Sequence, residues 1–377
     1  MLKYIHEVKL MNTIGIICEY NPFHNGHLYH IKKIKELYPD SNIVLVMSGN
    51  FTQRGDASII NKWDKTQIAL DNNIDLVVEL PFKFTCQSAD LFAYGAVNIL
   101  NILKVDTIVF GSETNDISMF NKIADVQLSK EYDLKVKDFV LQGNNYATSL
   151  SKALDSFGFK NIKKPNDILA ISYIRELKRI NSNIKTISIK RNTDYNSKEL
   201  TNDITSATSI RENIKTTDIK KYVPKNVYPY LKSKLYFIDD YYPFLKYKII
   251  SDDNLDKYVG VEEGIDNKIK KVIYNSNTYE ELIMNIKSKR YTYSKIKRIL
   301  LSILIGFEKK DFNKNINYIR VLGFNKKGRN YLNKIKKEIN IPIYTNFKKE
   351  MNFELKVTSI YDINLVKKEI SGLIKND

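Results

Sequence analysis

The segment that decides the fold runs from Ile14 to His30 and reads IGIICEYNPFHNGHLYH. Its first five residues, Ile14 to Cys18, are apolar enough to form a buried strand, and the polar residues 19–25 predict a sharp turn. A helix is expected to begin at Gly26–His27, because the apolar residues that follow recur at helical spacing: Leu28, Ile31 and Ile34.

This arrangement puts His24, Asn25, Gly26 and His27 at the N-terminus of a helix. Unpaired backbone N–H groups and the positive end of the helix dipole make such a terminus a natural seat for phosphate. Two imidazoles three residues apart add donors aimed at the same anion, and Gly26 lacks a side chain that would keep a nucleotide from the backbone. His24 and His27 are therefore the candidate catalytic residues.

The chain has four histidines, and three of them, His24, His27 and His30, lie within seven residues. Two other interpretations compete with a phosphate site: a solvated helix start with incidental histidines, and a zinc site. No cysteine pair lies nearby, and the spacing differs from the i, i+4 pair of a zincin helix, so we predict no metal site.

The four residues from His24 to His27 resemble the HxGH signature of the nucleotidylyltransferase superfamily, whose members bind ATP and attack its α-phosphate. The string EYNPFHNGHLYH, followed by MSGNFTQRGDASIINKW from Met47 to Trp63, resembles one branch, the bacterial tRNA(Met) cytidine acetate ligases. The resemblance covers residues 11 to about 216 and extends more weakly over most of the remainder. It implies that ATP is bound by Ile17, Cys18, Glu19, Tyr20, Asn21, Pro22, Phe23, His24, Asn25, Gly26, His27, Leu28, Tyr29 and His30.

At 377 residues, 43% of them hydrophobic, the chain is long enough for two or three domains. It has no run of 18 apolar residues, so no membrane span is expected. Residues 1–10 are too short and mixed for a signal peptide, and family members begin near Met11, so these ten residues are a predicted N-terminal extension. Cys18 and Cys86 are the only cysteines, which fits a reduced, cytoplasmic protein.

The formal charge of +17 is unevenly distributed. Residues 217–377 contain 33 Lys and Arg against 19 Asp and Glu, whereas residues 1–216 contain 27 against 24. A Lys-rich composition can reflect AT-rich coding, but that bias would act on both parts alike. The imbalance favours a polyanionic partner for the C-terminal part.

From residue 13 to about 215, short β-rich runs alternate with helical stretches, which predicts an α/β, Rossmann-like domain over residues 11–216 with a parallel sheet. Beyond it we predict a mainly helical, basic RNA-binding part, residues 217–377. The expected strands are Ile14–Cys18, Asn42–Met47, Leu76–Glu79, Thr107–Phe110 and Ile184–Ile189. The expected helices include His27–Leu37, Lys62–Asp71, Ser88–Leu103, Tyr146–Phe157 and Asp167–Ile180.

Ligands of such folds collect at the carboxyl ends of the strands, and three loops there carry candidates. Gly111 allows close approach to a base or ribose, although a plain tight turn explains it as well. Asn166 and Asp167 follow Pro165 and also suit a helix cap. Arg191 ends the last strand and suits phosphate. The resemblance implies ATP contacts for Gly111, Asn166 and Arg191 and leaves Asp167 in doubt.

The segment from Ser206 to Arg211 opens another helix. Alone it is a common capping motif, but it resembles the second superfamily signature, which binds the β- and γ-phosphates, and this implies an ATP contact for Ser209. Lys62 and Arg54 are candidates for an anionic group near the site. Trp63, the only tryptophan, is expected in the core rather than as a base-stacking platform.

In the C-terminal part, residues 288–298 interleave cations with tyrosines. RNA binding uses cations for phosphate and rings for unpaired bases, but a charged helix face gives the same string. Residues 319–324 predict a strand that enters a basic turn. The candidate tRNA-binding residues are Lys289, Arg290, Lys297, Arg298, Lys326, Lys327 and Arg329.

Three hypotheses follow. The resemblance implies an enzyme that uses ATP, with Mg²⁺, to convert acetate to acetyl-adenylate and then acetylates N4 of the wobble cytidine of elongator tRNA(Met). A small-molecule adenylyltransferase is the second hypothesis, and it has no use for the basic region. A non-catalytic RNA-binding protein is the third, and the joint presence of the histidines, Gly111, Asn166 and Arg191 disfavours it. The sequence does not indicate the oligomeric state.

Overall fold

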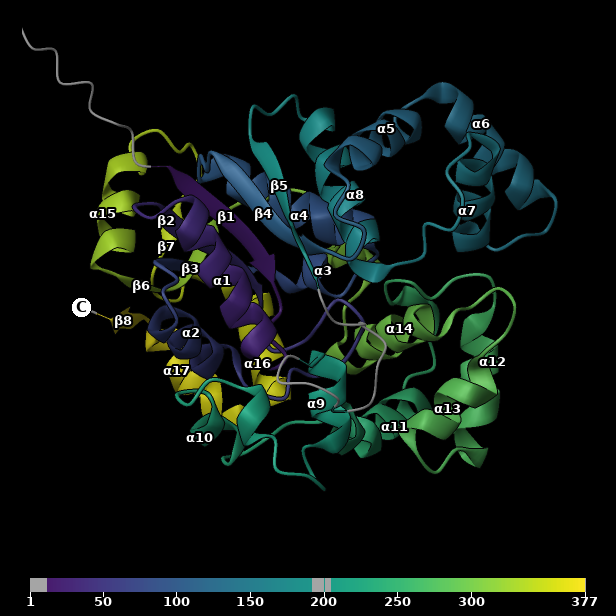
Figure 1. Ribbon diagram of the computed structural model, residues 1–377. Helices are drawn as coiled ribbons and strands as arrows, with labels where there is room; N and C mark the ends of the chain where they lie inside the picture. Colours follow the sequence, from purple (N-terminus) through teal and green to yellow (C-terminus); the bar gives the residue numbers. More distant parts are fainter. Residues whose placement is uncertain (1–11, 192–199, 201–204, 377) are drawn as a thin grey trace, which may run out of the picture.

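The computed structural model describes residues 12–191, 200 and 205–376, so the predicted extension over residues 1–10 lies outside the described part. At its centre is an eight-stranded sheet with the order β5-β4-β1-β2-β3-β6-β7, and β8 pairs with β6 (Figure 1). The strands are β1 (Thr13–Cys18), β2 (Asn42–Ser48), β3 (Leu76–Leu80), β4 (Thr107–Ser112), β5 (Lys185–Lys190), β6 (Ile319–Asn325), β7 (Ile343–Tyr344) and β8 (Ile374–Asn376).

The first five strands are parallel, as predicted for a Rossmann-like domain. In the central pair, Thr13 lies opposite Asn42 and Cys18 lies opposite Met47, so β1 and β2 end at the same edge of the sheet. β1 also pairs with β4, and β4 pairs with β5. The loops that follow these strands therefore meet at one edge, which is where most of the predicted ATP-binding residues lie.

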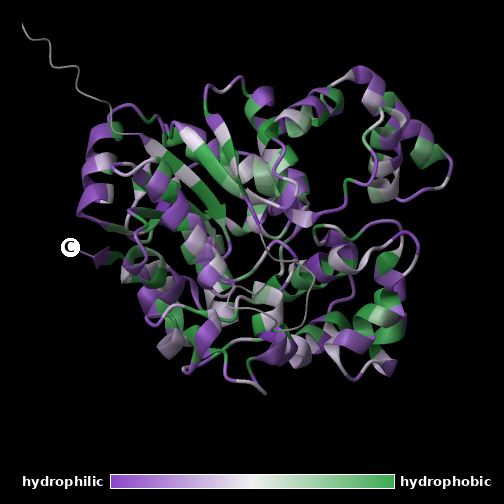
Figure 2. Cartoon of the chain, in the orientation of Figure 1, coloured by the Kyte–Doolittle hydropathy of each residue, from purple (hydrophilic) through white to green (hydrophobic). Residues whose placement is uncertain are grey.

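Helices cover both faces of this sheet. Alternate strand residues face opposite cores: Leu45 packs with α1 and α2, whereas Val44 and Val46 pack with α4, α5 and α8. In Figure 2 the central strands carry green, hydrophobic segments. These helices and their neighbours are α1 (Asn25–Leu37), α2 (Lys62–Asp71), α3 (Phe82–Thr85), α4 (Ala89–Ile102), α5 (Ile117–Gln127), α6 (Lys130–Leu141), α7 (Tyr146–Ser156) and α8 (Pro165–Arg179).

Beyond residue 205 the chain is mainly helical, as predicted, with short 3-10 turns between the helices. A second hydrophobic core lies among α11 to α14 and α16, and it also takes in Phe51 and Phe82 from loops of the N-terminal half. The helices are α9 (Ala207–Asn213), α10 (Tyr228–Leu231), α11 (Tyr242–Ser251), α12 (Ile265–Val272), α13 (Tyr279–Ile286), α14 (Tyr293–Ile305), α15 (Lys326–Ile335), α16 (Asn352–Tyr361) and α17 (Val366–Ser371).

The C-terminal half also completes the sheet. β6 runs antiparallel to β3, with Leu76 opposite Phe324, and β7 and β8 pair with β6. The predicted strand over residues 319–324 is therefore confirmed, but the basic turn expected after it is wrong. Asn325 Oδ1 accepts the backbone N–H of Gly328 at 3.0 Å and caps α15, so the basic residues form the first turn of a helix.

A domain division near residue 216 remains a prediction. The structure adds that three strands and the second core join sequence from both sides of that point. Within the described residues, no helix has the length and apolar character needed to cross a membrane.

Candidate active site

The turn after β1 is held by buried aromatic rings. Tyr20 has a positive φ of 48°, and its ring packs edge-on against Phe23 and His27 with centroid distances of 4.7 and 4.8 Å. Asn21 Oδ1 accepts the N–H of Ile59 at 2.8 Å, which ties the turn to the chain that follows β2. This packing balances the cost of the left-handed conformation at Tyr20 and fixes the start of α1.

His24 and His27 form the N-terminal cap of α1. His24 Nδ1 accepts the N–H of Gly26 at 3.0 Å, and His27 Nδ1 accepts the N–H of His24 at 3.2 Å. This reciprocal pair has the geometry of a capping box, with imidazoles in place of the usual hydroxyl and carboxylate. The sequence predicted that backbone N–H groups at this helix start are unpaired and available to phosphate. The Gly26 N–H is instead already hydrogen-bonded to His24.

The same contacts define the protonation of the two rings. Burial lowers the pKa of His24 from 6.5 to about 3, and Arg191 and Arg211 act in the same direction. Burial and the neighbouring His24 lower the pKa of His27 well below its ordinary value. Because each neutral ring accepts a backbone N–H at Nδ1, its proton lies on Nε2, and both Nε2–H groups are available as donors to a ligand.

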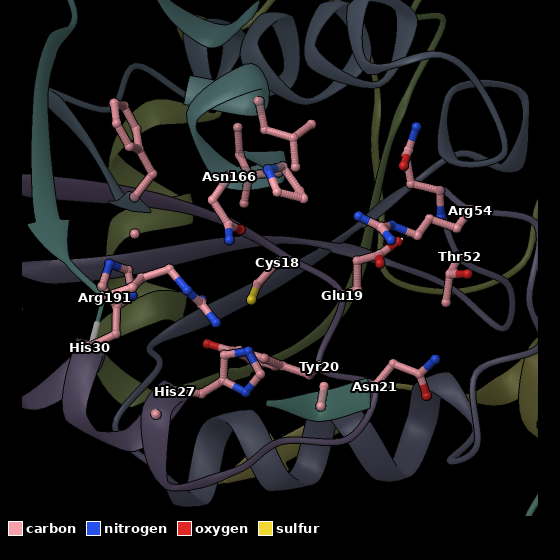
Figure 3. A pocket seen from close by; sticks show the side chains of 18 of the residues that line it. Cys18, Glu19, Tyr20, Asn21, His27, His30, Thr52, Arg54, Asn166 and Arg191 are labelled. Atoms are coloured by element: carbon pink, nitrogen blue, oxygen red, sulfur yellow. Dashed lines mark hydrogen bonds between the residues drawn. The ribbon is translucent and has the colours of Figure 1, made fainter. Parts of the chain in front are cut away.

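The histidines line a cavity of about 400 Å³ at the carboxyl edge of the sheet (Figure 3). That volume is within the range of ligand-binding sites. Among the predicted ATP contacts, the lining includes Ile17, Cys18, Glu19, Tyr20, Asn21, His24, Gly26, His27, Tyr29, His30, Gly111, Asn166 and Arg191. As far as the described residues go, it does not include Pro22, Phe23, Asn25, Leu28 or Ser209.

Two of these exceptions have other contacts. Phe23 is buried in the core beside Tyr20. Asn25 Nδ2 donates to the carbonyl of Lys221 at 2.8 Å. Phe23 thus packs in the core, and Asn25 links the start of α1 to residue 221.

One end of the cavity combines the loops after β4 and β5. A Cβ on Gly111 would lie 3.2 Å from Arg191 Cγ, so glycine leaves room for the arginine beside it. Asn166 Nδ2 donates to Glu113 Oε1 at 2.6 Å. In Figure 3, Arg191 and His30 lie on one side of His27, and Glu19, Arg54 and Thr52 lie on the other.

Asp167, which the sequence left in doubt, braces this end. Its Oδ1 accepts the Ser112 hydroxyl at 2.6 Å and the Glu113 N–H at 3.0 Å, and its Oδ2 accepts the Thr114 hydroxyl. Burial alone would raise the pKa of Asp167, but the hydrogen bonds from Ser112 and Thr114 hold it below its ordinary value. The carboxylate thus fixes the loop after β4 next to Gly111.

The predicted phosphate signature lies in α9. Ser206 Oγ accepts the N–H of Ser209 at 3.0 Å and caps the helix, while Ser209 is buried. Ala207 and Arg211 line the cavity, and Arg211 also donates to the carbonyl of Asn21 at 2.6 Å. The role predicted for Ser209 stays a prediction, and Arg211 is the cation that this segment brings to the site.

Sequence reasoning missed the apolar wall of the cavity. This wall comes from helices α4 and α8 and the end of β4. Its side chains recur at core-like helical or strand positions and carry no local signal of function. They are Phe92, Phe110, Ile168, Leu169 and Tyr173.

The expectation that Lys62 contacts an anionic ligand is wrong. Its buried ammonium lies 2.8 Å from Glu79 Oε1 and 2.8 Å from Glu369 Oε2. Arg54, the other candidate, does line the cavity. Trp63 is fully buried, in agreement with the prediction that it is a core residue.

Lys65, one turn further along α2, holds the strand ends together. Its ammonium donates to the carbonyls of Glu19, Ser48 and Gly49 at 3.0, 2.9 and 2.8 Å. Burial lowers the pKa of Lys65 to about 7, against the opposing effect of Glu19. The three carbonyls follow β1 and β2, so this lysine sets the position of the loops that line the cavity.

The predicted tRNA-binding cations do not form one cluster. Lys289 and Arg290 are exposed before α14. Lys297 forms an ion pair with Asp56, and Arg298 lines the cavity. Lys326, Lys327 and Arg329 begin α15. Lys327 donates to the Ser41 carbonyl at 3.1 Å, next to the amino end of β2, so α15 starts at the opposite edge of the sheet from the histidines.

Among the described residues, no group of three side chains from His, Cys, Asp and Glu is arranged to hold a metal ion.

Comparison with known proteins covers almost the whole chain. The family model described as HIGH Nucleotidyl Transferase matches residues 11–374. The chain is 42% identical to the tRNA(Met) cytidine acetate ligase of Clostridium kluyveri over 92% of each chain. It is 40% identical to the enzyme of that name from a Thermoanaerobacter species, over 96% of this chain and 98% of the relative.

Solved structures agree with the sequence matches. The apo form of Thermotoga maritima TmcAL is 28% identical and superposes with a TM-score of 0.89 over 97% of this chain and all of the other. The form bound to alpha-thio ATP is 29% identical, with a TM-score of 0.86 over the same shares. The resemblance drawn from the histidine motif is thus confirmed, and this chain belongs to the tRNA(Met) cytidine acetate ligase family.

Proposed function

We propose that this protein acetylates N4 of the wobble cytidine of elongator tRNA(Met), using ATP and acetate. The pair of neutral imidazoles at the start of α1 carries the proposal, because two fixed Nε2–H donors in a buried cavity suit the phosphates of ATP. The relative crystallised with alpha-thio ATP supports ATP as the nucleotide.

The first step is nucleotidyl transfer. An acetate oxygen attacks the α-phosphorus, the bond to the β-phosphate breaks, and pyrophosphate leaves with acetyl-adenylate formed. The protein supplies no covalent nucleophile, so catalysis rests on positioning and on neutralising charge. His24, His27, Arg191 and Arg211 line the cavity and provide the donors and cations for this. Mg²⁺ would be carried by the triphosphate.

In the second step the N4 amine of cytidine attacks the acetyl carbon. The carbon–oxygen bond to AMP breaks, AMP leaves, and the amine loses a proton. Glu19, a carboxylate in the cavity wall, is the group that we propose accepts this proton. Its Oε1 accepts the Gln53 N–H at 2.7 Å and the Ser48 hydroxyl at 3.3 Å, so the group is held in place.

RNA binding is proposed from the C-terminal half. Its charge excess is concentrated in residues 217–377, and α14 from this half reaches the cavity. The exposed Lys289 and Arg290 lie just before α14, and we propose them as phosphate contacts. Lys326, Lys327 and Arg329 remain candidates for a tRNA that extends around the molecule.

Pyrophosphate release tests the proposal against a small-molecule adenylyltransferase. Purified protein is incubated with ATP, Mg²⁺ and tRNA, with or without acetate, and pyrophosphate is measured. We expect pyrophosphate release that requires acetate. We also expect the acetyl label to appear in the tRNA. Release that ignores acetate and depends instead on a phosphorylated small molecule would support the second hypothesis.

A further inference from the structure

One wall of the cavity comes from the basic half of the chain. Ser294 and Arg298, one turn apart on the same face of α14, line the cavity together with Thr52, Gln53 and Arg54 from the loop after β2. The site is therefore composite, with the nucleotide loops from one half and a guanidinium from the other.

Close contacts between α14 and this loop fix the position of Arg298. Gly55 has a φ of 83°, and a Cβ there would lie 2.7 Å from the carbonyl carbon of Lys297 and 2.8 Å from the nitrogen of Arg298. Asp56 forms an ion pair with Lys297. The loop thus packs on the helix backbone itself, and Arg298 is delivered to the cavity by a rigid element.

The Arg298 guanidinium is half-buried without an acidic partner. In the described ranges of the chain, no carboxylate lies within ion-pair distance of it, whereas the adjacent Lys297 has Asp56. Burial lowers the pKa of Arg298, and the nearby Arg54 adds to the effect. A partly buried cation without an anion is costly, which points to an anionic ligand at this place.

We propose that Arg298 binds the carboxylate of acetate. This inference rests on the proposed function, and it supplies what that reaction needs on the acceptor side. Acetate must approach the negatively charged triphosphate, and a guanidinium that holds one carboxylate oxygen offsets this repulsion while the other oxygen attacks the α-phosphorus. Arg54 lies in the same wall, on the side of His27 away from Arg191 (Figure 3).

The test compares Arg298→Gln and Arg298→Lys with Arg290→Gln. Arg290 is exposed in the segment just before α14 and lies outside the cavity. Arg290→Gln therefore removes an equal charge without changing the cavity wall. The KM for acetate, the KM for ATP and the Kd for tRNA are measured for each protein. For Arg298→Gln we expect the acetate KM to rise about 10- to 100-fold, as for loss of a charged hydrogen bond. We expect a smaller rise for Arg298→Lys.

The ATP KM and the tRNA Kd of both Arg298 variants should stay near wild-type values. Arg290→Gln should show the reverse, with weaker tRNA binding and an unchanged acetate KM. An unchanged acetate KM for Arg298→Gln, with weaker and less salt-dependent tRNA binding, would assign Arg298 to an RNA phosphate and overturn the inference. If Arg298→Gln does not fold, the acetate KM of Arg298→Lys decides. A wild-type protein that transfers no acetate would instead refute the proposed function.

Discussion

At the scale of single residues, His24 has two roles that substitution can separate. Its Nδ1 caps α1 and its Nε2–H faces the cavity. Asparagine is a good N-cap residue but lacks the imidazole donor. We therefore expect the free energy of unfolding of His24→Asn to lie within about 1 kcal/mol of the wild-type value. Its acetyl transfer rate should fall by about 100-fold or more.

His24→Ala is the matched control, because it removes the cap as well. It should lose similar activity and about 1 kcal/mol more stability in urea unfolding. Full activity in His24→Asn would mean that the imidazole has no part in the reaction.

The lowered histidine pKa values predict a pH dependence of stability. Below pH 6.5 the unfolded chain protonates its histidines, whereas in the folded chain burial holds the pKa of His24 at about 3 and that of His30 at about 4. The unfolded state then binds more protons, so the free energy of unfolding falls as the pH drops from about 7 to 5.

Urea unfolding at several pH values measures this slope. A variant with His24→Asn and His30→Gln should show a shallower slope than wild type, because two of the groups responsible are gone. Equal slopes would contradict the neutral, buried histidines.

At the scale of elements, the contact between the loop after β2 and α14 depends on Gly55. In Gly55→Ala the new Cβ meets helix backbone and the positive φ is strained, so the loop must move. We expect a loss of about 1–3 kcal/mol in stability and a higher KM for acetate.

Gly143→Ala provides the matched control. Gly143 has the same φ of 83° but nothing within 4 Å of its added Cβ. Gly143→Ala should lose only the stability that the strained φ costs. It should keep the wild-type KM for acetate. Equal effects of the two substitutions on the acetate KM would show that the loop contact does not position the site.

Element prediction from sequence succeeded where the signal is local. The five parallel strands and the start of α1 follow from apolar runs and spacing near each element. The pairing of β6 with β3 was not predictable, because it joins Leu76 to Phe324 and no short pattern encodes a partner that far along the chain.

The site shows the same division. The histidine motif marks the edge of the sheet where the cavity lies, whereas Lys62 and Arg54 look alike in sequence. Glu79 and Glu369, one of them near the other end of the chain, give Lys62 a structural role.

At the scale of the whole molecule, this Lys62 cluster ties α2 and β3 to α17. Lys62→Met leaves two buried carboxylates without their cation, so we expect a loss of about 3–5 kcal/mol in urea unfolding. The folded protein should keep its KM for acetate, since the cluster does not line the cavity.

Adding Glu79→Gln and Glu369→Gln should restore part of the stability by removing the unpaired charges. A loss below about 1 kcal/mol for Lys62→Met would mean that this ion cluster contributes little to holding the two halves together.

The central claim is that this composite cavity joins acetate to a tRNA cytidine at the expense of ATP. The most direct measurement is nucleoside analysis of elongator tRNA(Met) after incubation with the purified protein, ATP, Mg²⁺ and labelled acetate. We expect labelled N4-acetylcytidine at the wobble position, dependent on ATP and lost in His24→Asn. Wild-type protein that leaves this cytidine unlabelled, or labels it equally without ATP, would contradict the claim.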